Sequence, residues 1–204
     1  CTNTPPNQPV GGGITNFSGA GGAGGGTQTG AASVALCYND NVCFDVVFDD
    51  PNAANVLTIT TDGTTLMPGA TFTQTGSNPV TGTFCWTAQP GFTGNVVTFV
   101  VQDDACPIVG TNSFSVNFAI TPGVTAGPDD FICGSQTAQL SASGGGPYTW
   151  SPATGLSCTN CANPVASPAT TTTYTVVGSL TGSCPNTDQV TVNVVFPFNL
   201  TATA

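Results

Sequence analysis

The sequence has no residue that carries a full positive side-chain charge, and this absence excludes most catalytic chemistry. Lys, Arg, His and Glu are all missing from its 204 residues, so the 10 acidic side chains are all Asp and the formal net charge is −10. General acid–base and nucleophilic catalysis rely mostly on His, Lys or Glu, and no Ser–His–Asp or Cys–His arrangement can be built without His. The Asp-Thr-Gly and Asp-Ser-Gly motifs of an aspartic dyad are also missing. The sequence therefore predicts a protein that is not an enzyme.

The one-sided charge also excludes two classes of partner. Nucleic-acid binding needs Lys or Arg to neutralise phosphates, and attraction to anionic lipid headgroups needs the same residues. No apolar stretch approaches the roughly 18 residues of a membrane-spanning helix. Hydrophobic residues make up 39% of the chain, which excludes simple disorder. Stability must come from sheet hydrogen bonds, apolar burial, disulfides and bound cations, since no salt bridge between side chains can form.

Cysteine is abundant, which indicates an oxidising, extracellular compartment. The 9 cysteines are Cys1, Cys37, Cys43, Cys85, Cys106, Cys133, Cys158, Cys161 and Cys184. A metal cluster is the competing interpretation, but His is absent and the spacing is wide and irregular. One pair alone, Cys158 and Cys161, has the close spacing of a zinc knuckle or a redox motif. We therefore predict disulfides.

Strand signals dominate the chain. Short runs in which Thr, Val and Phe alternate are bounded by Gly, Pro, Asn and Asp, whereas no apolar set recurs at helical spacing. The expected strands are a pair within 34–48 and single strands at 55–61, 69–75, 81–88, 95–102, 111–121, 136–143, 147–150, 172–178 and 187–195. This pattern predicts an all-β fold of tandem immunoglobulin-like β-sandwich domains with disulfides.

Composition divides the chain into four segments. Residues 1–33 are rich in Pro and then in Gly, which predicts an entry linker and first-strand region. Residues 34–121 and 122–195 are the two predicted sandwich domains. The last residues repeat the order of strand end, Pro and small residues found where the first domain hands over to the second. We therefore interpret 196–204 as the start of a further repeat.

The second domain carries motifs that resemble a known repeat. They are GPDDFICG at 127–134, LSASGG at 140–145, YTWSPATGL at 148–156, NPVASP at 163–168 and TTTYTV at 171–176. Together they resemble the Ig-like repeats, close to the polycystic-kidney-disease (PKD) type, of giant secreted proteins of Bacteroidota. These are the gliding-motility-associated surface proteins exported by the type IX secretion system. The resemblance covers nearly all of 123–195.

The first domain resembles a cadherin-like repeat of the same class of protein over about 1–121. The motifs that carry this resemblance are Cys37 with Cys43-Phe44, DDPN at 49–52, LT at 57–58, GTFCW at 82–86 and QDDACP at 102–107, with CTNTPP at 1–6 as the entry linker. The two resemblances imply a segment of a cell-surface adhesin or filament, serving adhesion or gliding. Its partners would be neighbouring repeats or subunits of the same protein, together with surface glycans.

The Ig-like pattern suggests disulfide partners in the first domain. Cys43 and Cys85 each lie in an expected strand beside an aromatic residue, and many Ig-like domains place a cross-sheet disulfide against a buried Trp. We therefore pair Cys43 with Cys85 and Cys37 with Cys106. The main alternative exchanges the partners, giving Cys37–Cys85 and Cys43–Cys106.

In the second domain we pair Cys133 with Cys184 and Cys158 with Cys161. A redox role for the closely spaced pair is disfavoured, since no cation is present to stabilise a thiolate. Cys1 is then left over. It is either unpaired in the chain, bonded to an upstream domain or another chain, or the lipidated first residue of a mature lipoprotein.

The Asp clusters are the candidate functional residues, because calcium takes six to eight oxygen ligands. The cadherin-like resemblance implies a calcium site at the entry linker. It would use Asp49, Asp50, Asp103 and Asp104, with Asn3 from the linker. A similar junction site would use Asp129 and Asp130. Cadherin sites also use Glu, which this sequence lacks. The alternative interpretation is that these residues cap turns and keep the surface soluble.

Three functions follow from these features. The first is a non-catalytic stalk or filament segment of a large secreted cell-surface protein. The second is an accessory glycan- or surface-binding module of a secreted enzyme. The third is a fibre subunit that adds a terminal strand, residues 196–204, to the next chain.

Overall fold

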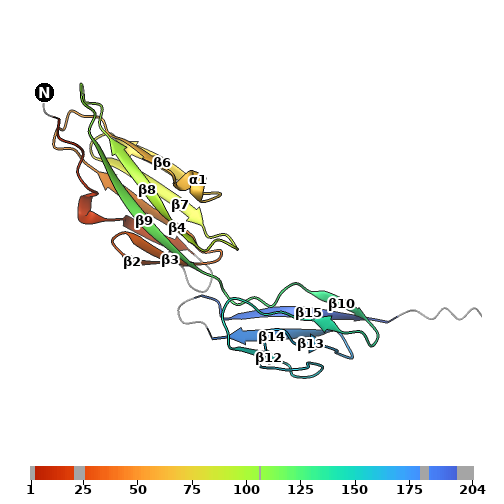
Figure 1. Cartoon of the computed structure of the whole chain (residues 1–204). Helices are drawn as coiled ribbons and strands as arrows, with labels where there is room; N and C mark the ends of the chain where they lie inside the picture. The colour runs from red at the N-terminus through yellow and green to blue at the C-terminus, as the bar shows by residue number, and fades with distance from the viewer. Residues whose placement is uncertain (1–2, 21–25, 106, 180–183, 197–204) are drawn as a thin grey trace, which may run out of the picture. The chain divides into compact units, whose positions relative to one another are not determined.

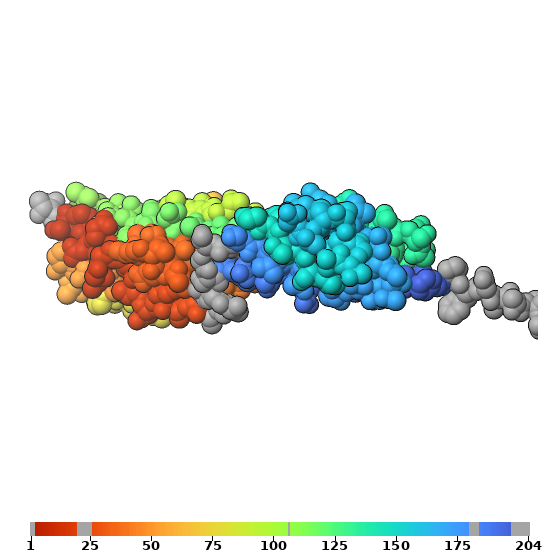
Figure 2. Space-filling model, turned by 90° about the horizontal axis from the view of Figure 1, so that it is seen from below, coloured from red at the N-terminus to blue at the C-terminus, as the bar shows by residue number. Residues whose placement is uncertain are grey.

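The computed structural model describes residues 3–20, 26–105, 107–179 and 184–196, which form two compact units (Figure 1). Unit 1 is Cys1–Thr121 and unit 2 is Pro122–Ala204. The division falls where the sequence places the start of the second domain. In Figure 2 the surface of unit 1 runs from red to green and that of unit 2 from cyan to blue. Within the described residues, no helix is both long enough and apolar enough to span a membrane.

Unit 1 is a sandwich of two sheets. The four-stranded sheet contains, in spatial order, β1 (Thr15–Ala20), β4 (Asn41–Phe48), β7 (Val80–Thr87) and β6 (Thr71–Gly76). The five-stranded sheet contains β2 (Thr27–Gly30), β3 (Ser33–Cys37), β9 (Thr111–Thr121), β8 (Gly94–Gln102) and β5 (Thr58–Thr61). β3 and β9 run parallel, and the other neighbours are antiparallel. A 3-10 turn (Val10–Gly12) and a one-turn helix, α1 (Gly63–Leu66), complete the unit.

The core of unit 1 follows from the alternation of its strands. In β4 and β7 every second side chain is buried, and the others face outward. The inward positions carry aromatic rings that meet between the sheets: Phe44, Phe84, Trp86, Phe99 and Phe118. Phe, Trp and β-branched residues fit a half-buried pleated surface. This explains why these runs form strands rather than helices.

Unit 2 is smaller and its second sheet is short. Its main sheet contains, in spatial order, β10 (Asp130–Cys133), β15 (Thr187–Val195), β14 (Thr172–Gly178) and β12 (Tyr148–Ser151). The second sheet pairs β11 (Ala138–Gln139) with β13 (Val165–Ala166). β10 runs parallel to β15. Trp150 and Tyr174 are the largest buried side chains, and they pack with Val176, Val190 and Val192.

Both units are immunoglobulin-like β-sandwiches, as the strand pattern predicted. An Ig sandwich has strands A, B, E and D in one sheet and C, F and G in the other. The sheet β1-β4-β7-β6 of unit 1 has the A-B-E-D order, and β9-β8-β5 has the order G-F-C. Unit 2 keeps the G-F-C order in β15-β14-β12 and reduces the other sheet to β11 and β13.

The structure differs from the sequence-based expectation in several places. The predicted entry linker and first-strand region, 1–33, contains two strands, β1 paired with β4 and β2 paired with β3. The strand expected at 55–61 begins at Thr58. The strand expected at 136–143 shortens to Ala138–Gln139. β10 and β13 were not expected.

Candidate functional site

The entry segment, residues 3–8, is held against the region that follows β8. The Nε2 of Gln8 donates to Oδ1 of Asn112 at 2.6 Å, and the Nδ2 of Asn112 donates to the carbonyl of Pro6 at 2.9 Å. In Figures 1 and 2 the segment is red and lies beside the green segment near residue 110. The entry segment therefore joins the loops that carry most of the predicted calcium ligands.

Asp103 is a buried carboxylate in which each oxygen has a donor. Its Oδ2 accepts from Nδ2 of Asn3 at 2.7 Å, and its Oδ1 accepts from the backbone N–H groups of Gly110 at 2.9 Å and Ala105 at 3.1 Å. Burial by itself raises the pKa of Asp103. The three donors outweigh that effect and hold the pKa below its ordinary value of 3.8. Asn3 thus meets Asp103, but as a hydrogen-bond donor to the carboxylate.

Asp49 and Asp104 connect separate segments in the same way. The Oδ1 of Asp49 accepts from Nδ2 of Asn7 at 2.9 Å, and the Oδ1 of Asp104 accepts from the backbone N–H of Val56 at 2.7 Å. In the ranges that the structure describes, no three Asp or Cys side chains come close enough to hold a metal ion together. The cadherin-like set of carboxylates is therefore not assembled as one cluster.

Asp50 differs from Asp49 and Asp104 because it is buried while one of its oxygens has no hydrogen bond. Its side chain is 7% exposed. The Oδ1 accepts from the backbone N–H of Asn52 at 2.7 Å and from Nδ2 of Asn55 at 3.3 Å. The Oδ2 is the one buried side-chain oxygen or nitrogen of the described residues that lacks a hydrogen bond. The sequence signal for this difference is the alternation of 41–48, in which the inward positions Val42, Phe44, Val46 and Phe48 share the parity of Asp50, whereas Asp49 has the outward parity.

In unit 2 the two candidate residues cap backbone groups. The Oδ1 of Asp129 accepts from the N–H of Thr191 at 2.7 Å, and the Oδ1 of Asp130 accepts from the N–H of Phe131 at 2.8 Å. Thr191 lies in β15 and Phe131 in β10. The alternative interpretation was that these residues cap turns, whereas the N–H groups that they cap belong to strands.

Cys43 and Cys85 form a disulfide with a Cα–Cα distance of 4.2 Å, which is the predicted pairing. Its expected location between the two sheets is wrong. The two residues lie directly opposite each other on neighbouring strands of one sheet, β4 and β7. Adjacent residues of a strand face opposite sides, so burial of Phe44 and Trp86 places both sulfurs on the outer face. That adjacency was visible in the sequence and was sufficient to exclude a core position.

The contact between the sheets is aromatic instead. Phe44 of β4 meets Phe99 of β8 edge-on, with ring centroids 6.1 Å apart and an interplanar angle of 77°. In an Ig domain these two strands, B and F, usually carry the inter-sheet disulfide. The rings fill that place in unit 1 and leave the disulfide to tie strands within one sheet.

The predicted Cys133–Cys184 disulfide is wrong, because Cys133 is exposed and free. The parallel pairing of β10 with β15 sets Cys133 opposite Val195, at the end of β15. Cys184 precedes Thr187, the first residue of that strand. At about 3.3 Å per residue, β15 alone separates its two ends by about 26 Å. The Cα atoms of a disulfide lie within about 7 Å.

The disulfide partners of four further cysteines are not fully settled by the described residues. Cys37 and Cys184 are each disulfide-bonded. Cys106, the partner predicted for Cys37, lies outside the described residues, as does Cys1. The Cys37–Cys106 pairing and the fate of Cys1 therefore stay predictions.

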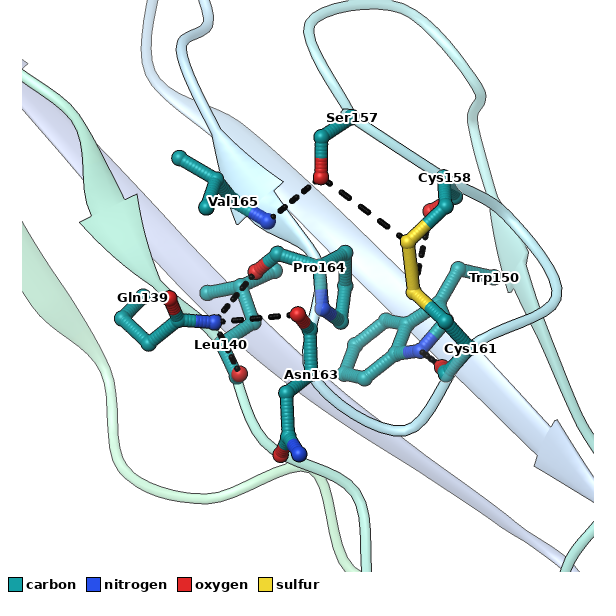
Figure 3. Close-up of a disulfide and its surroundings, with 9 residues drawn as sticks. All are labelled: Gln139, Leu140, Trp150, Ser157, Cys158, Cys161, Asn163, Pro164 and Val165. Carbon is teal, nitrogen blue, oxygen red and sulfur yellow. Dashed lines mark hydrogen bonds between the residues drawn. A yellow bond between two sulfur atoms is a disulfide. The ribbon is translucent and has the colours of Figure 1, made fainter.

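Cys158 and Cys161 are joined as predicted, and they clip a loop against the core of unit 2 (Figure 3). The indole N–H of Trp150 donates to the carbonyl of Cys161 at 2.9 Å, and its backbone N–H donates to the carbonyl of Thr159 at 2.7 Å. The loop thus satisfies both donors of a buried Trp. This arrangement gives the disulfide a structural role.

The same loop region also binds the edge of β11 (Figure 3). The Nε2 of Gln139 is within 3.1 Å of the carbonyls of Leu140, Asn163 and Pro164. The Oγ of Ser157 accepts from the N–H of Val165 at 2.9 Å. These hydrogen bonds hold the loop against the second sheet of unit 2, which has two short strands.

Tyr174 closes the other side of the core of unit 2. Its hydroxyl donates to the carbonyl of Thr154 at 2.9 Å. The next residue, Gly155, has a φ of 79°, a conformation that favours Gly. Burial raises the pKa of Tyr174 above its ordinary value of 10.0, because the charged form would lose its hydration.

Comparison with known proteins adds little to these contacts. No family model and no curated protein matches the sequence. The Ig1–Ig2 pair of DIP-gamma is 10% identical, with a TM-score of 0.46 over 96% of this chain and 99% of that one. An E-to-A variant of titin domains I67–I69 is 12% identical, with a TM-score of 0.38 over 81% of this chain and 63% of that one. At this level the likeness carries no argument, and the Ig-like assignment stands on the strand order of the two units.

Proposed function

We propose that this chain is a non-catalytic structural segment of a large secreted cell-surface protein. The supporting observation is that in each unit an early strand runs parallel to the last one. β3 pairs with β9 over five residues, from Ser33 opposite Asn117 to Cys37 opposite Thr121. β10 pairs with β15 in the same way, from Asp130 opposite Val192 to Cys133 opposite Val195.

Such a pair resists tension applied to its two strands, because sliding parallel neighbours past each other loads their hydrogen bonds together rather than one at a time. In unit 2 the pair joins the first and last strands, so tension on the two ends loads it directly. In unit 1 the tension reaches β3 after β1 and β2, which precede it in the chain. The disulfides strengthen each unit further, and they form in an oxidising environment such as the cell exterior. These properties suit a stalk or filament that carries load.

The finer assignment rests on the sequence resemblance. The PKD-like motifs of unit 2 and the cadherin-like motifs of unit 1 support a surface protein of the gliding-motility type, exported by type IX secretion. Its partners would be neighbouring repeats of the same protein. Surface labelling of intact cells tests this location. Labelling only after cell lysis would contradict it.

Single-molecule pulling tests the mechanical role. The chain is held at both ends in the presence of a thiol reductant, so that disulfides do not limit extension. We expect two discrete rupture events, one for each unit. Asn117→Pro removes the N–H of β9 that donates to the carbonyl of Ala32, at the start of the parallel pair, and should lower the rupture force of unit 1 alone. Gradual extension of the wild-type chain without discrete ruptures would overturn the proposal.

Two observations bear on the alternatives. Most Phe residues and both Trp residues pack in the cores. The strongly exposed aromatic rings of the described residues are Phe131, at 69%, and Phe196, at 64%, and two rings are a weak platform for glycans. For a strand-adding fibre, the outward N–H groups of β10 are already capped, Phe131 by Asp130 and Cys133 by Gln136. Such capping protects a sheet edge from pairing with another chain. Of the expected donor strand, 196–204, all but Phe196 lies outside the described residues.

A further inference from the structure

The loop that follows β4 contains a buried carboxylate, one oxygen of which has no hydrogen-bond partner. Asp50 is 7% exposed, and its Oδ2 makes no hydrogen bond with any described residue. Buried polar atoms are almost always hydrogen-bonded, and an unpartnered one destabilises the fold, more so if it is charged. A stable fold therefore requires some compensating partner for this oxygen.

No cationic side chain supplies that compensation to Asp50. A buried carboxylate is commonly neutralised by a cationic side chain, but the whole chain has no Lys, Arg or His. The Oδ1 is already occupied by the donors from Asn52 and Asn55. The remaining candidates are a bound cation and a trapped water.

The surroundings of Asp50 are rich in oxygen. Asn55 is also buried, and its amide nitrogen is the group that faces Oδ1, so its carbonyl oxygen is not engaged in that bond. Asn78 orders the backbone on both sides, accepting from the N–H of Asp50 at 3.0 Å and donating to the carbonyl of Asn52 at 2.9 Å. Carboxylate, amide and carbonyl oxygens are the ligands that hard divalent cations prefer.

We propose that Oδ2 of Asp50 binds one hard divalent cation within the 50–55 loop of unit 1. The site differs from the set that the cadherin-like resemblance implies, because Asp103 has a donor on each oxygen and takes no part. Ca²⁺ is the suitable probe, since it accepts irregular oxygen sets, whereas Mg²⁺ demands near-octahedral geometry and releases its water reluctantly. The site is independent of the mechanical role proposed for the chain.

Thermal unfolding of the oxidised chain tests the site, with Trp fluorescence of a Trp150→Phe variant reporting unit 1 alone. Trp86 is then the only Trp, because the chain has 2. With 10 mM CaCl₂ we expect a melting temperature about 5 °C higher than with EDTA, as for a ligand at about ten times its Kd. NaCl at equal ionic strength should give a smaller rise, since salt also screens the net charge of −10. MgCl₂ should give less than CaCl₂.

Substitutions locate the site. Asp50→Asn should abolish the calcium-specific rise. The matched control is Asp103→Asn, which removes another buried carboxylate of unit 1 and should lower the melting temperature while keeping the rise. If Asp50→Asn does not fold, Asn55→Ser serves instead and should weaken calcium binding 10- to 100-fold by calorimetry, as expected for loss of a supporting contact.

Two results would overturn the proposal. One is an equal melting temperature in CaCl₂ and in NaCl of the same ionic strength, which would leave a trapped water as the partner of Oδ2. The other is a calcium-specific rise that persists in Asp50→Asn, which would place the cation elsewhere. Neither result would affect the pulling experiment.

Discussion

The two units fill their hydrophobic cores in different ways. Unit 1 has two full sheets, and its core is a cluster of aromatic rings that need no polar partners, apart from Trp86, whose indole N–H donates to Pro68. Unit 2 has one full sheet and a two-stranded remnant. Its two largest buried side chains, Trp150 and Tyr174, both depend on loop carbonyls for a hydrogen bond.

The disulfides of the two units also differ in what they hold in place. In unit 1 the Cys43–Cys85 bond lies on the outer face and ties strands that the core already positions. In unit 2 the Cys158–Cys161 bond shapes the loop that supplies acceptors to Trp150. A large apolar core tolerates a disulfide as reinforcement, whereas a small domain needs its loops held in place.

The largest effect should come from the aromatic cluster. Phe99 is fully buried between Phe44 and Phe84, so Phe99→Ala should destabilise unit 1 by about 4 kcal/mol. Denaturant unfolding measures this, with Trp86 as the probe. The exposed control, Phe131→Ala in unit 2, should change stability by less than about 0.5 kcal/mol. Similar costs for the two variants would contradict an aromatic core in unit 1.

The two disulfides offer a second comparison. Chain entropy predicts that the loop closed by Cys43 and Cys85, with a separation of 42, is worth about 4 kcal/mol. The loop of Cys158 and Cys161, with a separation of 3, is worth about 2 kcal/mol. Paired Ala substitutions measured by denaturant unfolding give both values. Loss of the Cys158–Cys161 disulfide should also expose Trp150 and shift its emission to longer wavelength. Loss of the Cys43–Cys85 disulfide should leave Trp86 buried. No shift for Trp150 would contradict a clipping role.

Acid should weaken unit 1 through Asp103. Its folded pKa is lowered from 3.8, so its contribution is fully present above that value and is lost as the pH falls below it toward the folded pKa. Asp103→Asn should cost about 2 kcal/mol at neutral pH, because backbone donors lose their charged acceptor. The variant should also lose stability less steeply than the wild type between pH 4 and the lower end of the titration. Parallel pH profiles would show that Asp103 is not the responsible group.

The smallest effect belongs to Tyr174 in unit 2. Its raised pKa means that its contribution is present below pH 10 and is lost as the pH rises through the folded pKa. Tyr174→Phe should cost about 1 kcal/mol, the value of one hydrogen bond, and should reduce the alkaline loss of stability. Tyr148→Phe is the control. An equal loss in both variants would remove the distinction between the two tyrosines.

Much of unit 1 was predictable because its strands are long. The alternation in 111–121 is carried by a strand with those same bounds, and 81–88 differs from β7 by one residue at each end. Unit 2 was less predictable, since β11 and β13 have two residues each and are held by loop contacts that no local pattern signals. The candidate site was likewise predictable only in part. Asp49, Asp50, Asp103 and Asp104 were identified by type, but their different hydrogen bonding depends on burial and on partners as much as 100 residues away.

The sequence by itself determined the chemistry that is absent and the class of fold. A chain without Lys, Arg, His or Glu is denied most catalytic groups and all side-chain salt bridges, and alternating Thr, Val and Phe can bury one face only as strands. The tertiary structure decided which groups meet. The parallel pairing of β10 with β15 separates Cys133 from Cys184, and the pleat of β4 turns Cys43 outward while Phe44 enters the core. Burial then leaves Asp50 with one oxygen unpartnered, because packing controls access to water and to donors distant in the chain.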